Sequence, residues 1–436
     1  MTRRFFVNAA AASAVASGVA SGANSKLALQ GGTPVRTTPF PSWPRTAPAD
    51  EQALVAVVKT GRWYRGAGKQ VDRFEEKYAS LLGAKHCLAT ANGTSALITS
   101  LYGLGVEPGD EVLVPPYTFV ATVNAVLMHH ALPVFVDTDP HSFQMDAKKV
   151  EAAITERTKV ILPVHVGGAP ADLDTILGVA SKHKLAVLED ACQAHLAEWR
   201  GRKVATGGTA GCYSFQNSKN LNSGEGGAIL TNSDDLVERC FAYHNNGRGR
   251  KVDSYHFAYT QNGANLRMTE FQAALLMTQM IPIEQNAKLR EQNAAHLTSL
   301  LKEIPGVEPA KPHEGCTRNA FHLYMLRYRK EQFGGLSRAA FLKALKAEGI
   351  PASGGYTPLN KEPFLQNALK SRVYQALYPK ATLEQWVERN ECPVNDQLCQ
   401  EAVWFTQNVL LDTRQGMEQI AEAIRKVQAN ARAIAS

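Results

Sequence analysis

The stretch Cys212-Tyr-Ser-Phe-Gln-Asn-Ser-Lys-Asn-Leu-Asn-Ser-Gly-Glu-Gly-Gly-Ala-Ile229 decides the fold class of this chain. It begins as an apolar, strand-like run, and its lysine, Lys219, stands five residues after Ser214 and just before a Gly-Glu-Gly-Gly turn. Most lysines are solvated surface charges, but few lie between an aromatic strand and a glycine-rich turn. Upstream, the apolar run Leu185-Ala-Val-Leu-Glu-Asp190 indicates a second strand that ends in an aspartate. The amine and the carboxylate together indicate a cofactor site.

These residue types match the needs of pyridoxal phosphate (PLP). This cofactor requires an amine that forms a Schiff base, a carboxylate that keeps the pyridine nitrogen protonated, and donors for its phosphate. Lys219 is the candidate amine and, once displaced by substrate, the base that moves a proton. Asp190 is the candidate carboxylate, although aspartates at strand ends are often simple caps. Asn92-Gly-Thr-Ser95, where a strand turns into a helix, is either a phosphate site or an ordinary helix cap.

The composition is that of a large globular enzyme. The chain has 436 residues, of which 44% are hydrophobic and 20% are charged, so it can bury a sizeable core divided into two packed units. The net charge is +7, but the basic residues are spread along the chain, and no nucleic-acid partner is expected. The seven cysteines form no C-x-x-C pair, so they are interpreted as buried residues, and no metal site is expected.

Residues 1–30 are interpreted as an export signal and leader. Met1-Thr-Arg-Arg-Phe-Phe-Val-Asn8 places two adjacent arginines before an Ala-, Ser- and Gly-rich stretch that ends in small residues around Ser21-Gly-Ala23. This layout resembles the twin-arginine type of signal, whose route moves folded proteins, so that a cofactor would be loaded before export. The alternative is a disordered leader on a cytoplasmic protein. The stretch is too short and too rich in Gly and Ser for stable membrane insertion.

From Gly31 onward, short apolar runs alternate with segments of helical periodicity. Such runs are typical of strands buried on both faces, so residues 31–280 are predicted to form a large α/β domain with a mainly parallel sheet. In such sheets, ligands bind at the carboxyl ends of the strands. A long helix is expected after residues 263–275, through about Leu300, and the boundary near residue 280 leaves a smaller α+β domain over residues 281–436. Its helix over residues 337–348 is predicted to begin with Ser337 as the N-cap.

The motifs occur together in an order that resembles a known family. They are Asn92-Gly-Thr-Ser95, Glu189-Asp-Ala-Cys-Gln193, Ser214-Phe-Gln-Asn-Ser-Lys219 with Gly224-Glu-Gly-Gly227, and Gly263-x-Asn265-x-Arg267. From about Gly31 to the C-terminus, the chain is similar to the DegT/DnrJ/StrS family of PLP-dependent sugar aminotransferases. The resemblance implies the aspartate aminotransferase-like fold, called fold type I, and a homodimer with active sites at its interface.

The resemblance also assigns roles around the cofactor ring. It implies Lys219 as the Schiff-base lysine and Asp190 as the partner of the pyridine nitrogen. Gln193 would hydrogen-bond the phenolic oxygen of the cofactor, where family members carry His or Gln. Phe119, in Pro-Tyr-Thr-Phe, would stack on the ring, although by itself it is interpreted as a core aromatic residue.

The remaining roles concern the phosphate and the substrate. Gly93, Thr94 and Ser214 would bind the phosphate. Asn265 would reach the phosphate of the neighbouring subunit, or is a turn asparagine before the long helix. The stretch Gly354-Gly-Tyr-Thr-Pro-Leu359 contains Tyr356, a candidate substrate contact or a simple turn aromatic. His322 is a second candidate substrate contact.

The activity implied by the resemblance is transamination, because the chain keeps the lysine that some members replace by histidine for dehydration. Glutamate or glutamine would convert PLP to pyridoxamine phosphate, which would then aminate a keto-sugar or keto-cyclitol in a ping-pong reaction. The motif sequences around Lys219 and Tyr356 resemble those of the cyclitol and aminohydroxybenzoate branch more than those of the nucleotide-sugar branch. One alternative is a PLP-dependent lyase or an aromatising dehydratase of the aminohydroxybenzoate synthase kind. Another is a PLP-binding regulatory protein without turnover.

Overall fold

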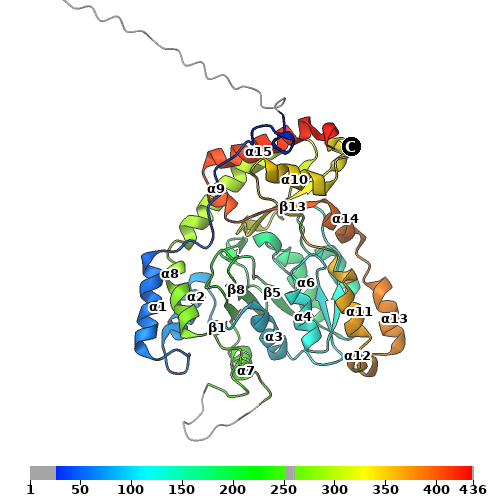
Figure 1. The fold of residues 1–436 in the computed structure, drawn as a ribbon. Helices are drawn as coiled ribbons and strands as arrows, with labels where there is room; N and C mark the ends of the chain where they lie inside the picture. Colours follow the sequence, from blue (N-terminus) through cyan, green and yellow to red (C-terminus); the bar gives the residue numbers. More distant parts are fainter. Residues whose placement is uncertain (1–25, 251–258, 260, 435–436) are drawn as a thin grey trace, which may run out of the picture.

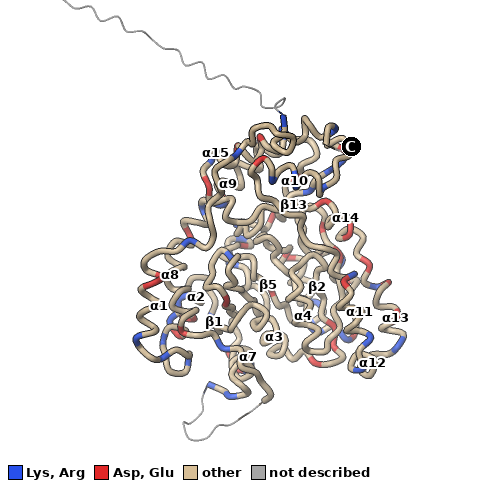
Figure 2. Tube along the Cα trace, in the orientation of Figure 1, with Lys and Arg blue, Asp and Glu red and all other residues tan. Residues whose placement is uncertain are grey.

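The computed structural model describes residues 26–250, 259 and 261–434. Figure 1 shows a central sheet flanked by helices, with a smaller part built from the C-terminal strands and helices above it in this view. Figure 2 shows basic and acidic residues interspersed over both parts. Among the described residues, no helix has both the length and the apolar character needed to cross a membrane. Of the predicted export signal and leader, residues 1–30, the first 25 lie outside the described residues, and the last five are described, with Leu27 buried in the core of the smaller part.

In the described chain, the central sheet has seven strands in the spatial order β1-β9-β8-β5-β4-β2-β3. Neighbouring strands pair in parallel except at β9, which is antiparallel to both β1 and β8. The mainly parallel sheet predicted from the sequence is therefore confirmed. The strands are β1 (His86–Thr90), β2 (Glu111–Val114), β3 (Leu132–Phe135), β4 (Thr158–Ile161), β5 (Ala186–Asp190), β8 (Ala210–Ser214) and β9 (Gly227–Thr231).

Helices cover both faces of this sheet, which explains why its strands are apolar without alternation. Val112 and Leu188 belong to the core on one face, and Leu113 and Ile161 belong to the core on the other, all with no exposed surface. The helices of this part are α1 (Pro48–Thr60), α2 (Gln70–Leu82), α3 (Gly93–Gly103), α4 (Ala121–Met128), α5 (Ala147–Ala153), α6 (Leu173–His183), α7 (Asp234–His244) and α8 (Glu270–Gln279). A small separate sheet joins β6 (Glu198–Trp199), β7 (Arg202–Lys203) and β11 (Cys316–Arg318).

The C-terminal part has its own core. Its antiparallel sheet, as far as the chain is described, runs β10 (Val307–Pro309), β12 (Leu323–Tyr328) and β13 (Ala402–Thr406). The sheet packs with α9 (Ile283–Leu301), α10 (Arg338–Ala347) and α15 (Arg414–Ala429). Ser337 caps α10 as expected from the sequence, because its Oγ accepts a hydrogen bond from the Ala340 N–H at 3.2 Å.

The start of the described chain lies on this C-terminal part. Leu27 is buried in its core. The Glu348 carboxylate accepts hydrogen bonds from the Ala28 and Val35 N–H groups and pairs with Lys426 at 2.8 Å, within the same core. The predicted division at residue 280 stays a prediction, and the structure adds that the first described residues pack across it.

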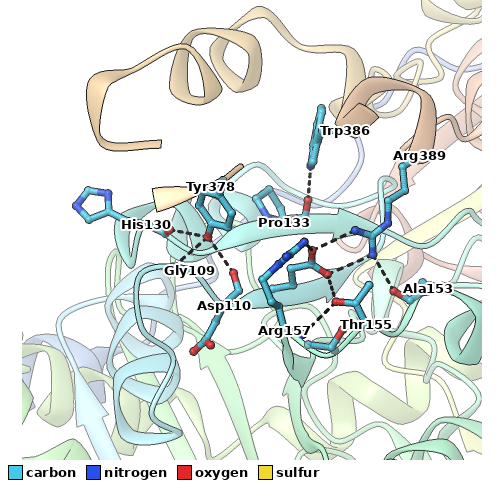
Figure 3. A network of polar contacts seen from close by, with 12 residues as sticks. Gly109, Asp110, His130, Pro133, Ala153, Thr155, Arg157, Tyr378, Trp386 and Arg389 are labelled. Atoms are coloured by element: carbon cyan, nitrogen blue, oxygen red, sulfur yellow. Dashed lines mark hydrogen bonds and ion pairs between the residues drawn. The ribbon is translucent and has the colours of Figure 1, made fainter. Parts of the chain in front are cut away.

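A helical segment of the C-terminal half packs on the edge of the central sheet instead. It contains α11 (Pro363–Leu369), α12 (Arg372–Leu377) and α13 (Lys380–Arg389) and leads into α14 (Pro393–Glu401). Figure 3 shows Trp386 and Tyr378 pointing from this segment towards the sheet. The Trp386 indole N–H donates to Pro133 O at 2.8 Å, and the Phe135 N–H donates to Asn390 Oδ1 at 2.6 Å. These bonds satisfy backbone groups of β3, which has a free edge in the sheet.

Candidate active site

A cavity of about 610 Å³ opens at the carboxyl ends of the parallel strands β1, β5 and β8. Nine of the ten predicted site residues line it: Gly93, Thr94, Phe119, Asp190, Gln193, Ser214, Lys219, His322 and Tyr356. A larger hollow of about 830 Å³ lies between α9 and β12 and contains none of these residues. The chemistry predicted from the sequence therefore converges on the smaller cavity.

One end of the cavity is the start of α3. Asn92 is the N-cap, and its Oδ1 accepts a hydrogen bond from the Ser95 N–H at 2.8 Å. The first N–H groups of a helix have no acceptor within the helix and attract anions. Ser214 lies so close that a Cβ on Gly93 would stand 2.7 Å from the Ser214 Cβ. Only glycine fits there, which leaves a small, donor-rich cradle of the kind that holds a phosphate.

Asp190 is fixed at the end of β5, with only 4% of its surface exposed. Its Oδ2 accepts a hydrogen bond from the Thr122 hydroxyl at 2.9 Å, and its Oδ1 accepts one from the Cys192 N–H at 3.1 Å. Thr118 in turn lies 2.9 Å from the Thr122 hydroxyl. The carboxylate is thus held in one orientation by α4 and by its own turn.

Gln193 has a fixed amide orientation. Its Oε1 accepts a hydrogen bond from the Gly167 N–H at 2.8 Å, so its amide nitrogen faces the cavity and donates to Tyr356 Oη at 3.0 Å. Burial raises the pKa of Tyr356 to about 12, so its hydroxyl stays protonated. The second N–H of Gln193 can serve the phenolic oxygen of a cofactor.

Lys219 lies on a loop that the fold holds from both sides. Its N–H donates to Gln216 O at 2.9 Å, and the Trp43 indole N–H donates to Lys219 O at 3.1 Å. Burial lowers the pKa of the Lys219 amine, and Cys192 and Asp190 oppose this shift only in part. The lowered pKa favours the neutral amine, which is the nucleophilic and basic form.

Phe119 and Asn265 differ from the other predicted site residues, the first in its exposure and the second in its position. Phe119 lines the cavity but has 57% of its surface exposed, so it is not a core residue within one chain. Asn265 does not line the cavity: it is exposed and forms a bridge to Asn245. The structure therefore gathers the other nine residues, and the contact of Asn265 with a neighbouring subunit stays a prediction.

The sequence analysis missed several residues that shape this site. Thr122 follows Pro-Tyr-Thr-Phe in the sequence, and its place after strand β2 was a signal that could have found it. Trp404 lines the cavity from β13, and Trp43 holds the loop from a segment near the N-terminus. Neither tryptophan lies in a motif, so only the folded structure brings them to the site.

The donor set fits pyridoxal phosphate. The cavity offers a buried amine in Lys219, a buried carboxylate in Asp190 and an oriented amide in Gln193. The cradle at Gly93 and Ser214 supplies room and N–H groups for a phosphate. The sheet and this arrangement define a PLP-dependent transferase of fold type I.

The comparisons with known proteins place the chain more narrowly. The pattern of the DegT/DnrJ/EryC1/StrS aminotransferase family matches residues 45–425, and the chain belongs to this family. It is 36% identical over 414 residues to the L-glutamine:2-deoxy-scyllo-inosose aminotransferase of Streptomyces paromomycinus, covering 92% of this chain and 97% of that protein. It is 37% identical over 424 residues to a putative L-glutamine:3-amino-2,3-dideoxy-scyllo-inosose aminotransferase of Streptoalloteichus tenebrarius, covering 94% and 99%.

Solved structures support the same family assignment. The crystal structure of 3-amino-5-hydroxybenzoic acid (AHBA) synthase superposes with a TM-score of 0.81 at 32% identity, covering 90% of this chain and 99% of that one. The structure of S. venezuelae DesV in complex with an intermediate gives a TM-score of 0.74 at 29% identity, covering 87% and 94%. The chain is thus a PLP-dependent aminotransferase, and its predicted likeness to the cyclitol and aminohydroxybenzoate branch is confirmed.

Proposed function

We propose that this chain transfers the amino group of L-glutamine to a keto-cyclitol in a ping-pong reaction. The names of the cyclitol aminotransferases that it resembles over nearly its whole length support both the donor and the acceptor. The observation that carries the choice of acceptor is the charge of the cavity. Among the described residues that line it, Lys219 is the only lysine or arginine. A nucleotide-linked sugar would bring a diphosphate, which proteins bind with several cations, whereas a cyclitol is neutral.

The residues of this chain would divide the work. Bound pyridoxal phosphate supplies a carbonyl carbon that takes up the amino group and a ring that withdraws electrons. Lys219 is proposed to attach the cofactor and then to move the proton at the α-carbon of glutamine. Asp190, held by Thr122, keeps the pyridine nitrogen protonated. Gln193 donates to the phenolic oxygen.

The phosphate end and the open side complete this assignment. Gly93, Thr94 and Ser214 are proposed to bind the phosphate at the start of α3, where the helix dipole favours an anion. Phe119 is proposed to stack on the ring, because it lines the cavity with an exposed face. Both roles require only groups that already face the cavity.

The test is a product assay with the purified protein, L-glutamine and 2-deoxy-scyllo-inosose. We expect an amino-cyclitol by mass spectrometry, formed only when glutamine is present, and no turnover by Lys219→Ala. Lys219→Arg is the matched control, because it keeps a cation but lacks the amine nucleophile. An active Lys219→Ala variant would rule out this mechanism.

The second candidate is the aromatising dehydratase, favoured by the structural likeness to AHBA synthase. It is distinguished by its product, because a dehydratase would convert its substrate to an aromatic compound without consuming an amino donor. An ultraviolet-absorbing product that forms in the absence of glutamine would support it and reject the transaminase.

We also propose that the enzyme is a homodimer whose sites are shared between subunits. Large apolar side chains exposed on the single chain support this: Trp63 is 52% and Ile281 is 73% exposed, in addition to Phe119 at the cavity. Asn265, exposed outside the cavity, would then reach the cofactor phosphate of the partner subunit. Light scattering on the purified protein should give twice the mass of the chain, and a monomer that turns over substrate would contradict the proposal.

Export through the twin-arginine route is a further proposal, which rests on the Arg3-Arg4 pair and the small residues that follow it. The alternative is a cytoplasmic enzyme with a leader. A tagged full-length protein should appear outside the cytoplasm in a shortened form, and Arg3→Lys with Arg4→Lys should keep it inside. A full-length protein that stays in the cytoplasm would show that the signal does not work.

A further inference from the structure

His322 and Tyr356 are the two predicted site residues to which the proposed function gives no role, and His322 carries the stronger chemistry. It stands just before β12, so it reaches the cavity from the C-terminal part, whereas Asp190 and Ser214 come from the central sheet. Only 7% of its surface is exposed. Its side chain is thus a fixed part of the cavity wall.

The hydrogen bonds around His322 determine which ring nitrogen carries the proton. The Asn220 amide nitrogen donates to the carbonyl oxygen of Ala320 at 2.7 Å, so the amide can face in only one direction. Its oxygen, Oδ1, lies 3.3 Å from His322 Nδ1. An amide oxygen only accepts, so Nδ1 must be the protonated nitrogen. Nε2 is therefore left with a lone pair.

Nε2 is accessible from the cavity. It has no hydrogen-bond partner among the described residues, and it is not one of the completely buried polar atoms. His195, a nearby histidine, shows the contrast, because both of its ring nitrogens are completely buried without a partner. The lone pair of His322 is therefore exposed to a ligand, whereas His195 is not.

The ring of His322 is neutral. Burial lowers its pKa well below the ordinary value, and the neighbouring basic groups Lys219, His195 and Arg290 act in the same direction. His322 and the reacting Lys219 line the same cavity. A neutral acceptor cannot hold a carboxylate, but it can accept a hydrogen bond from an O–H or N–H group.

We propose that His322 Nε2 accepts a hydrogen bond from a hydroxyl group of the keto-cyclitol, next to its carbonyl carbon, and so selects polyol acceptors. This inference rests on the proposed function. Glutamine offers an N–H group near its reacting carbon only in the amine that is transferred, and its amide lies at the far end of the side chain. A cyclitol carries hydroxyl groups beside the reacting carbon, and His322 lines the same cavity as Lys219.

Two substitutions separate the acceptor atom from the rest of the side chain. His322→Asn keeps a donor near Nδ1 for Asn220 but places no acceptor at the position of Nε2. His322→Gln is longer and places an oxygen near that position. We expect His322→Asn to lower kcat/KM for 2-deoxy-scyllo-inosose about tenfold, mainly through KM, and His322→Gln to restore most of it. The rate at which glutamine alone converts the cofactor should not change in either variant.

A substrate analogue gives the matched control. Replacing the hydroxyl beside the carbonyl by hydrogen should cost the wild type about tenfold and His322→Asn almost nothing, because the partner is already missing. Nitrogen-15 NMR of the cofactor-free protein provides a readout without activity, and it should show His322 protonated at Nδ1 alone.

Each outcome has a separate meaning. A proton on Nε2, or equal losses by His322→Asn with both forms of the substrate, would overturn the inference. An equal loss in the reaction with glutamine would also overturn it, because the residue would then act on the donor or on the fold. A wild type that makes no amino-cyclitol at all would instead reject the proposed function.

Discussion

Lys219 and Glu111 are both ionisable groups buried in the large part of the molecule, and their surroundings are opposite. The Glu111 carboxylate has no exposed surface and is met by Arg389 and Arg157, each at 3.1 Å. Figure 3 shows these arginines and Thr155 converging at the edge of the sheet. The Lys219 amine, in contrast, has no side-chain hydrogen bond among the described residues, and only Cys192 and Asp190 favour its charge.

The pKa is lowered for both groups, but a lowered pKa favours the charged form of a carboxylic acid and the neutral form of an amine. Burial acts to raise the pKa of Glu111, but hydrogen bonds from Arg389, Thr155 and Arg157 outweigh it and lower the pKa, so the carboxylate stays charged. At Lys219, burial dominates and lowers the pKa, so the amine tends to lose its charge. A paired charge stabilises the contact between two segments, while an unpaired one is available for chemistry.

The prediction with the largest expected effect concerns the active site, where Asp190 lies in the same cavity as Lys219. Asp190→Asn should keep the geometry and the hydrogen bond from Thr122 but remove the charge that holds the pyridinium proton. We expect the cofactor to stay bound and kcat to fall about a hundredfold or more. Steady-state rates and the visible absorbance of the bound cofactor measure the two properties separately. Thr122→Val is the control, since it disturbs only the orientation and should cost less. An unchanged kcat would remove Asp190 from its proposed role.

Next in size is a test of the paired charge. Arg389→Ala removes one of the two arginines from Glu111 and loosens α13 from the sheet. We expect the free energy of unfolding in urea to fall by about 2 kcal/mol, with kcat unchanged, because this network lies away from the cavity. Lys380→Ala, on the same helix, has a side chain that is 84% exposed and should have almost no effect. A loss of activity without a loss of stability would link this edge to the active site.

The comparison also shows what can be predicted from a sequence. Asp190 and Ser214 end β5 and β8, whose apolar runs are local signals, and Lys219 lies on the loop after β8, so their meeting follows from the rule for parallel sheets. Ser337 was found as a cap for the same reason, because a cap is a local signal.

Contacts between distant segments could not be predicted in this way. Arg389 and Glu111 are 278 residues apart, and nothing in either local pattern indicates the other. The placement of α11 to α13 on the edge of the central sheet depends on shape complementarity with β3, which periodicity does not encode. The hydrogen bond between Trp43 and the Lys219 loop also joins segments far apart in the sequence, so no local pattern predicts it. The sequence therefore predicts the active-site residues better than the contacts that hold them in place.

The smallest expected effect tests whether the unpaired amine costs stability. In the cofactor-free protein, Lys219→Met keeps an apolar side chain of similar length and removes the buried charge. We expect the free energy of unfolding at neutral pH to rise by about 1 kcal/mol, opposite in sign to Arg389→Ala. The gain should depend on pH. Well below the lowered pKa, both the folded and the unfolded chain carry the proton, so the wild type bears the full cost of burial.

Between the lowered pKa and the ordinary value of 10.5, only the unfolded chain keeps the proton, so the stability of the wild type rises with pH. Above 10.5 both states are neutral, and the advantage of Lys219→Met should vanish. Urea unfolding of both proteins across this range measures the difference. Lys380→Met, which replaces an exposed lysine, should show no such trend. If Lys219→Met were less stable than the wild type at every pH, packing of the lysine stem, and not its charge, would decide the stability of the site.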